Sequence, residues 1–183
     1  ITFCYLRSMK KIILITGGQR SGKSVYAENL AIRLSPSPIY LATAHIWDEE
    51  FMIRVKKHQE RRGTNWTNIE EEKFLSRHYV YNKVCVIDCL TLWCTNFFYD
   101  KSREDNNQPS VDEALTAIKD EFDKFTNQEA TFIFVTNEIG SGGVSDNAIQ
   151  RRFTDLEGWM NQYVARKANE VILMVSGIPI KIK

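Results

Sequence analysis

The sequence predicts an α/β fold in which helices cover both faces of a mostly parallel sheet. Short apolar runs alternate along the chain with segments of helical periodicity, an order typical of strand–helix–strand units. The runs at 84–88, 131–135 and 171–175 are almost uniformly apolar, as strands covered on both faces must be. A chain of 183 residues without a linker-like stretch is long enough for one well-buried core. We therefore expect a single domain over residues 9–183.

The first eight residues are expected to lie outside this domain. Residues 1–8 lack the architecture of a signal peptide, and Met9 is followed at once by two lysines and a strand, as at a natural start. We interpret residues 1–8 as a non-native or upstream extension.

The domain is expected to begin with a strand, a helix and a second strand. The apolar run 12–15 predicts the first strand, and apolar residues at helical spacing predict a helix over 25–34. Ser35-Pro36-Ser37-Pro38 ends that helix, and the short apolar run 39–42 predicts the second strand.

Two more helices are predicted before the strand at 84–88. The acidic residues 48–50 suit the first turn of a helix, and only a thin apolar stripe follows them, so we expect a mostly solvated helix. A second, shorter helix is expected around 71–77.

The remaining elements follow the same alternation. Residues 111–125 have a clear period of 3.6 and predict a long helix between the strands at 84–88 and 131–135. The other expected elements are a helix over 91–99, a polar loop over 101–110, a glycine-rich flexible loop at 140–143, a helix capped by Asp146 and running to about Lys167, the strand 171–175, and an edge strand over 180–183.

A glycine-rich segment links the first strand to the first helix and fits the pattern G-x-x-x-x-G-K-[ST]. Its four fixed positions would match by chance in roughly one chain in a hundred of this length. A strand that feeds such a turn points backbone N–H groups and the positive end of the helix dipole at one spot, which suits a polyphosphate. We expect Lys23 to reach the β- and γ-phosphates and Ser24 to ligate Mg²⁺. The segment consists of Gly17, Gly18, Gln19, Arg20, Ser21, Gly22, Lys23 and Ser24.

The composition argues against several classes of partner. Lys plus Arg (24) nearly balance Asp plus Glu (23), so the net charge gives no reason to expect nucleic acid or an anionic membrane. No apolar run approaches the ~20 residues of a membrane span. The cysteines fit neither a CxxC metal pair nor a disulfide framework, and we interpret them as buried thiols of a cytoplasmic protein, with a redox or metal role as the alternative. They are Cys4, Cys85, Cys89 and Cys94.

Polar residues stand at the ends of two predicted strands. In open α/β sheets, ligands bind at the carboxyl ends of the strands. Asp88 closes an apolar strand, where its carboxylate can hold Mg²⁺ directly or through water; capping the next helix is the alternative. Asn137 and Glu138 follow the next strand and suit a general base or a substrate contact, although loop chemistry alone also explains them.

His58 lies among basic residues at 56–62. By residue type alone it is either a surface histidine or a nucleophile that attacks an α-phosphate while the neighbouring cations neutralise charge. His45 and His78 have the same claim by composition. The four tryptophans, Trp47, Trp66, Trp93 and Trp159, are interpreted as core or interface residues rather than base-stacking platforms.

The chain resembles the bifunctional adenosylcobinamide kinase/adenosylcobinamide-phosphate guanylyltransferase family of cobalamin biosynthesis. The resemblance extends over essentially the whole chain from Met9 to Lys183 and is much more specific than the phosphate loop alone. The similar segments are 15–24, 40–44, 54–62, Trp66 with Glu70, 135–140 and 175–179.

This resemblance implies a RecA-like nucleotide-binding fold and two successive reactions. ATP or GTP first phosphorylates the hydroxyl of the adenosylcobinamide side arm, and GMP then passes from GTP through a guanylylated histidine onto that phosphate, with release of pyrophosphate. His58 matches the guanylylated histidine. The resemblance also implies a homo-oligomer, expected to be a trimer. Its nucleotide contacts correspond to the phosphate loop and to Ala42, Thr43, Ala44, Gln59, Glu60, Arg61, Arg62, Glu70 and Asp88.

Two positions depart from the family pattern, and three alternative functions remain. Some relatives have a second histidine where this chain has Lys57, and some have Glu in place of Asp88, whose shorter side chain favours water-mediated metal binding. The alternatives are a simple small-molecule kinase, a RecA-like ATPase or nucleic-acid-binding module, and a nucleotide-gated partner without catalysis. The corrinoid pocket and the base of the kinase step are not evident from the sequence.

Overall fold

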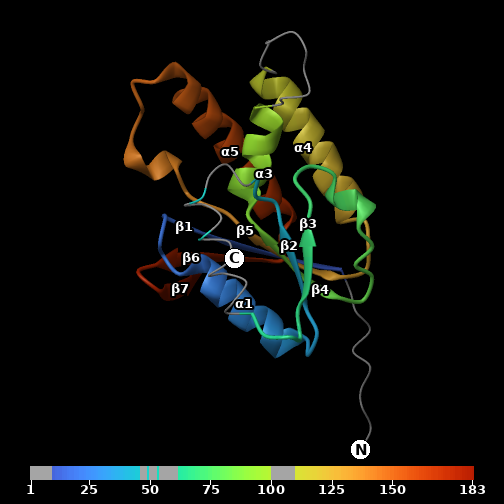
Figure 1. The fold of residues 1–183 in the computed structure, drawn as a ribbon. Coiled ribbons are helices and arrows are strands. Elements are labelled where there is room, and N and C mark those ends of the chain that lie inside the picture. The colour runs from blue at the N-terminus through green and yellow to red at the C-terminus, as the bar shows by residue number, and fades with distance from the viewer. Residues whose placement is uncertain (1–9, 46–48, 50–52, 54–61, 100–109) are drawn as a thin grey trace, which may run out of the picture.

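The structure, a computed structural model, describes residues 10–45, 49, 53, 62–99 and 110–183 (Figure 1). Its strands are β1 (Lys11–Gly17), β2 (Ile39–Ala42), β3 (Thr67–Glu70), β4 (Val84–Asp88), β5 (Thr131–Val135), β6 (Glu170–Val175) and β7 (Ile178–Lys181). They form one seven-stranded sheet in the order β3-β2-β4-β5-β1-β6-β7, in which β6 and β7 are antiparallel and the other neighbours are parallel. The predicted mostly parallel sheet with a C-terminal edge strand is therefore confirmed.

Helices cover both faces of this sheet (Figure 1). The described helices are α1 (Lys23–Leu34), α3 (Leu90–Phe98), α4 (Val111–Phe125) and α5 (Ala148–Lys167). Helix α1 lies on one face, where Ala27 packs with alternate strand residues such as Ile13. Helices α3, α4 and α5 lie on the opposite face, where Trp93 and Phe122 pack with the other set of strand residues, such as Leu14. Burial on both faces explains why the central strands are uniformly apolar.

The segment after residue 62 differs from the prediction. Residues 67–70 form the edge strand β3 beside β2, which the sequence analysis did not identify, because this strand is mostly exposed and shows no apolar pattern. The helix predicted around 71–77 is wrong except for one 3-10 turn, η1 (Leu75–Arg77). The Glu71 carboxylate accepts hydrogen bonds from the N–H groups of Lys73 and Phe74 at 3.0 and 2.9 Å, which stabilises a turn instead of a helix.

Two helices are capped by other residues than the sequence analysis suggested. Asn147, and not Asp146, caps α5, because its Oδ1 accepts hydrogen bonds from the N–H groups of Ile149 and Gln150 at 2.9 and 3.1 Å. Cys89 caps α3. Helix capping is therefore not the role of Asp88, and its carboxylate faces other groups.

The C-terminal hairpin is also shifted. Strand β7 begins two residues before the predicted edge strand over 180–183, because the hairpin turn consists of Ser176 and Gly177 alone. Their φ angles of 50° and 84° are those of a two-residue turn that matches the twist of the flanking strands. Pro179 is tolerated because β7 is an edge strand.

Burial agrees with most expectations for cysteine and tryptophan. Cys85, Cys89 and Cys94 are buried free thiols, and Trp66 and Trp93 are buried. Trp159 is 44% exposed, so it is not a core residue, and an interface role for it stays a prediction. Cys4, Trp47, residues 1–8 and nearly all of the predicted helix after residue 48 and loop over 101–110 lie outside the described residues. Among the described helices, none combines the length and apolar character needed to cross a bilayer.

Candidate functional site

The register of the parallel strands brings the predicted site residues to one edge of the sheet. Asp88 at the end of β4 pairs with Ala42 of β2 on one side and with Val135 of β5 on the other. Ala42 pairs in turn with Glu70 of β3, and Val135 pairs with Ile15 of β1. We call these five residues the strand-end row. The phosphate loop begins at the end of β1, just beyond the row.

The phosphate loop depends on two glycines. A Cβ at Gly17 would lie 2.4 Å from the carbonyl oxygen of Met174 in β6, so only glycine fits there without a backbone shift. Gly22 forms the N-cap of α1 with φ of 93°, in the left-handed region that favours glycine. The N–H of Glu138 donates to Gly17 O at 3.1 Å, which joins the loop to the segment after β5.

Lys23 lies folded back onto this loop. Its Nζ donates a hydrogen bond to Gly18 O at 2.6 Å, and the residue is buried. Burial lowers the pKa of Lys23, while Cys89, Asp88 and Glu157 oppose that change. A bound phosphate would therefore compete with Gly18 O for an ammonium group that is already poorly solvated.

Asp88 is held from one side by Tyr40. The Tyr40 hydroxyl donates to Asp88 Oδ2 at 2.8 Å, whereas Oδ1 accepts no hydrogen bond from the described residues. Burial, followed by the charge of Asp88, raises the pKa of Tyr40, so the phenol keeps the proton that it donates. The Arg62 guanidinium lies 3.5 Å from the centroid of the Tyr40 ring, and Arg62 Nη1 lies 3.6 Å from Glu28 Oε1 of α1. With a side chain only 4% exposed, Arg62 is engaged by the protein itself.

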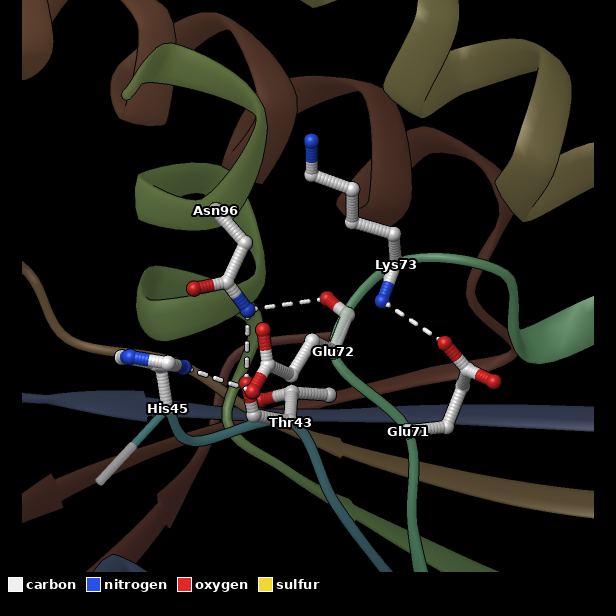
Figure 2. Close-up of polar contacts among 6 residues, drawn as sticks. All are labelled: Thr43, His45, Glu71, Glu72, Lys73 and Asn96. Carbon is white, nitrogen blue, oxygen red and sulfur yellow. Dashed lines mark hydrogen bonds and ion pairs between the residues drawn. The ribbon is translucent and has the colours of Figure 1, made fainter. Parts of the chain in front are cut away.

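Thr43 has all its polar groups engaged. Its hydroxyl donates to Cys89 O at 2.7 Å and accepts from Cys89 N at 2.9 Å. Asn96 Nδ2 of α3 donates to Thr43 O at 2.7 Å and to Glu72 O at 2.8 Å (Figure 2). We call this pair of bonds the Asn96 clamp. It ties the segments that follow β2 and β3 to α3.

The two described histidines each face a carboxylate. His45 Nδ1 lies 2.7 Å from Glu72 Oε1 (Figure 2), and His78 Nε2 lies 3.4 Å from Glu71 Oε2. The third histidine of the chain, His58, lies outside the described residues. Gln59, Glu60 and Arg61 also lie outside them, so their predicted contacts stay predictions.

The other predicted nucleotide contacts lie around the strand-end row. Gly18, Gln19 and Arg20 are exposed on the phosphate loop, and Arg20 has a positive φ of 62°. Ser21 is buried, whereas Ser24 and Ala44 are half-buried. The Thr43 hydroxyl and the Arg62 guanidinium, in contrast, are engaged by other groups of the protein.

A buried carboxylate near the phosphate loop was missed by the sequence analysis. Thr91 Oγ1 donates to Glu157 Oε1 of α5, and Thr91 Oγ1 accepts from Asn137 N at 2.9 Å. Burial raises the pKa of Glu157 to about 7; the hydrogen bond from Thr91 and the charge of Lys23 oppose the rise. A signal was present, because Glu157 occupies a core position at helical spacing from buried Met160.

The sequence model that describes cobinamide kinase / cobinamide phosphate guanyltransferase matches residues 13–182. This match covers the whole phosphate loop, the strand-end row and all seven strands apart from the first two residues of β1. The chain belongs to this cobinamide kinase/guanyltransferase family. The family resemblance stated from the sequence is thereby confirmed.

Curated relatives support the same assignment over their whole length. The chain is 35% identical over 181 residues to the "Bifunctional adenosylcobalamin biosynthesis protein CobU" of Escherichia coli (strain K12), covering 94% of this chain and 99% of the relative. The protein of that name from Salmonella typhimurium has the same identity and coverage. The family match and these relatives together span the described site from β1 to β7.

A solved structure supports the fold alone. The chain resembles an ATPase from the type III secretion system of pathogenic bacteria, with a TM-score of 0.52 and 12% identity over 90% of this chain and 51% of that chain. The cobinamide kinase/guanyltransferase domain thus shares its α/β architecture with a nucleotide-using ATPase, as the predicted RecA-like fold requires.

Removal of the Asn96 clamp should destabilise the domain. Asn96→Ala leaves two backbone carbonyls without their donor, and we expect the free energy of unfolding to fall by about 2–3 kcal/mol. Urea denaturation measures this change. Asn29→Ala, the same substitution on the exposed face of α1, is the control and should change stability by less than about 0.5 kcal/mol. Equal losses of stability in the two variants would contradict the stabilising role of the Asn96 clamp.

Glu157 should make stability depend on pH. Because burial raises the pKa of Glu157 to about 7, its favourable contribution is complete below its ordinary pKa and is lost as the pH rises through 7. Glu157→Gln removes this ionisation. As the pH rises from 5 to 8, the free energy of unfolding of the variant should therefore increase by on the order of 2 kcal/mol relative to that of the unchanged protein. Urea denaturation at both pH values measures the gain, and parallel pH profiles would contradict it.

Proposed function

We propose that this protein phosphorylates adenosylcobinamide and then attaches GMP to the new phosphate. The observation that carries the proposal is the family match over residues 13–182, which includes a phosphate loop whose glycines and Lys23 suit a polyphosphate. The names of the curated relatives, which are bifunctional proteins of adenosylcobalamin biosynthesis, support it. A simple kinase would explain the phosphate loop but not the family match.

In the first reaction, the substrate hydroxyl oxygen forms a bond to the γ-phosphorus of ATP or GTP. The bond between that phosphorus and the bridging oxygen breaks, the nucleoside diphosphate leaves, and the hydroxyl proton is released to solvent. Lys23 contributes by moving from Gly18 O to the phosphates, where its charge offsets the negative charge that moves toward the leaving group. The N–H groups at the start of α1 favour the same anion.

In the second reaction, an imidazole nitrogen of His58 attacks the α-phosphorus of GTP and pyrophosphate leaves. The phosphate made in the first reaction then attacks the guanylylated histidine, which frees His58 and yields adenosylcobinamide-GDP. The support for His58 is the resemblance over 54–62, since this segment lies outside the described residues. His45 and His78 lie outside the segment 54–62 that carries the resemblance, which makes them weaker candidates.

The proposed nucleotide contacts are residues 17–24 of the phosphate loop, Ala42, Thr43, Ala44, Glu70 and Asp88, with Gln59, Glu60, Arg61 and Arg62 from the segment around His58. The position of Glu70 and Asp88 in the strand-end row beside the phosphate loop supports their inclusion. Thr43 contributes through its backbone placement, since its hydroxyl is bound to Cys89.

The residues at the site fit Mg²⁺. Ser24 and Asp88 offer hard oxygen ligands, and Asp88 Oδ1 accepts no hydrogen bond from the described residues while Oδ2 is fixed by Tyr40. No cluster of three or more His, Cys, Asp or Glu suited to a metal occurs in the described part of the chain, which agrees with an ion that takes its other ligands from phosphates and water. Bound there, Mg²⁺ would neutralise phosphate charge.

The proposal also covers the domain organisation, the cellular location and the oligomeric state of the protein. We propose one domain over residues 9–183 that acts in the cytoplasm as a homo-oligomer, with a trimer expected by family resemblance. The near balance of basic and acidic residues supports small-molecule partners rather than nucleic acid.

Two substitutions should separate the two reactions. Lys23→Ala should lower both activities at least about 100-fold, because both need the polyphosphate positioned. His58→Ala should abolish guanylylation and leave kinase activity. Incubation with α-labelled GTP measures base-stable, acid-labile label on the protein, and phosphorylation of adenosylcobinamide is assayed separately.

His45→Ala is the matched control for the histidine and should keep the label. Label that persists in His58→Ala would defeat the guanylyltransferase proposal for His58, and label lost in His45→Ala alone would move the nucleophile there. If the unchanged protein fails to phosphorylate adenosylcobinamide, the kinase proposal is wrong.

Asp88 should set the requirement for Mg²⁺. Asp88→Asn removes the charge of the proposed ligand but keeps an oxygen, so half-maximal kinase activity should need roughly tenfold more Mg²⁺. Activity measured across Mg²⁺ concentrations tests this. Asp120→Asn on the exposed face of α4 is the control and should leave the requirement unchanged. An unchanged requirement in Asp88→Asn would exclude Asp88 as a ligand.

A further inference from the structure

Glu157 is a buried carboxylic acid beside the proposed nucleotide site. Glu157 lies on α5 and is 0% exposed, and its Oε1 accepts a hydrogen bond from the hydroxyl of Thr91 in α3. Its second oxygen, Oε2, is buried and has no hydrogen-bond partner among the described residues. A buried carboxylate with a bare oxygen is costly, whereas the neutral acid is tolerated more easily.

Hydrogen bonds connect this carboxyl group to the phosphate loop. Thr91 Oγ1, which donates to Glu157, accepts from Asn137 N at 2.9 Å and from Asn137 Nδ2 at 3.3 Å. The next residue, Glu138, donates its N–H to Gly17 O at 3.1 Å. The chain of contacts therefore runs from α5 through α3 and the end of β5 to the first residue of the phosphate loop.

The charged and titratable groups that face Glu157 come from several elements. Lys23 at the start of α1 attracts its negative charge, and Glu138 after β5 repels it. The thiols of Cys89 and Cys94, at the start of α3 and within it, also interact with this carboxylate. Asp123 of α4 faces α5 too, where it is paired with Lys167 near the helix end. Among these groups, Lys23 is the one whose positive charge attracts the Glu157 carboxylate.

We propose that nucleotide binding at the phosphate loop is coupled to protonation of Glu157. The inference rests on the proposed function only in taking the phosphate loop as the nucleotide site. A bound polyphosphate engages Lys23 and adds negative charge next to it, so the Glu157 carboxylate loses its attractive partner and gains a repulsive one. A proton from solvent adds to Oε2, and Oε1 keeps the hydrogen bond from Thr91. No other bond changes.

The pKa of Glu157 makes this coupling visible near neutral pH. Burial raises this pKa to about 7, so the group is partly ionised there before any ligand binds. If bound nucleotide raises the pKa by about one unit, uptake at pH 7.5 amounts to roughly half a proton per site. By linkage, affinity should weaken about tenfold as the pH rises from 6 to 9.

Isothermal titration calorimetry tests the proposal with α,β-methylene-GTP, which resists attack at the α-phosphate. Titrations at pH 7.5 in buffers of different ionisation enthalpy give the number of protons taken up on binding. We expect the count for Glu157→Gln to fall below that of the unchanged protein by roughly half a proton. Protonation of the ligand itself is common to both proteins and cancels in the difference.

Glu121→Gln is the matched control, because Glu121 is also a buried glutamate but lies on α4, where its Oε1 accepts from Ser76 N at 2.6 Å. This variant should keep the proton count of the unchanged protein. Equal counts in the unchanged protein and Glu157→Gln, with both binding the analogue, would overturn the coupling and leave the nucleotide site standing. If the unchanged protein fails to bind the analogue, the nucleotide site and the coupling are both wrong.

A second measurement needs no substitution. Infrared difference spectra of the unchanged protein at pH 7.5, recorded with and without the analogue, should gain the carbonyl band of a protonated carboxylic acid and lose carboxylate intensity. If Glu157→Gln does not fold, this spectrum alone decides, and the absence of the new band would overturn the proposal.

Discussion

The register of the parallel sheet determines which residues meet at the proposed nucleotide site. Glu70, Ala42, Asp88, Val135 and Ile15 pair across five strands, so their ends share one edge and one face. A slip of one residue in β4 would turn Asp88 to the other face, because side chains alternate along a strand. The hydrogen bond from Tyr40 and the electrostatic interaction with Lys23 at the start of α1 would both be lost. The site is thus a consequence of strand pairing.

The polar groups that meet at this edge need hydrogen-bond partners, and neighbouring elements supply most of them. Buried polar groups are costly unless they are hydrogen-bonded. The Asn96 clamp satisfies two carbonyls at the ends of β2 and β3, and Tyr40 fixes Asp88. Glu157 is an exception, since its Oε2 has no hydrogen-bond partner among the described residues, and Thr16 Oγ1 at the end of β1 is another. The groups that satisfy these hydrogen bonds are therefore distinct from Glu157, for which we propose a change of charge.

The sequence predicted the elements whose physics is local. Uniformly apolar runs predicted β4 and β5 at their bounds, and helical spacing predicted α4, because burial on both faces or on one stripe leaves a pattern. Strand β3 left none, since most of it is exposed and its position depends on pairing with β2. Asn147 replaced the neighbouring Asp146 as the cap of α5, because either side chain can accept these hydrogen bonds. Trp159 is 44% exposed, which its residue type alone does not reveal.

The sequence by itself determined the phosphate loop and the family, because a glycine that must lack a Cβ and a lysine at the start of a helix are constraints on residue type at fixed spacing. Only the tertiary structure decided the partners of those residues. It placed Arg62 against Tyr40 and brought Glu157 to Thr91, across 66 positions of the chain. Spacing along the chain cannot encode such contacts, because they arise when helices pack on a sheet whose strand order differs from the chain order.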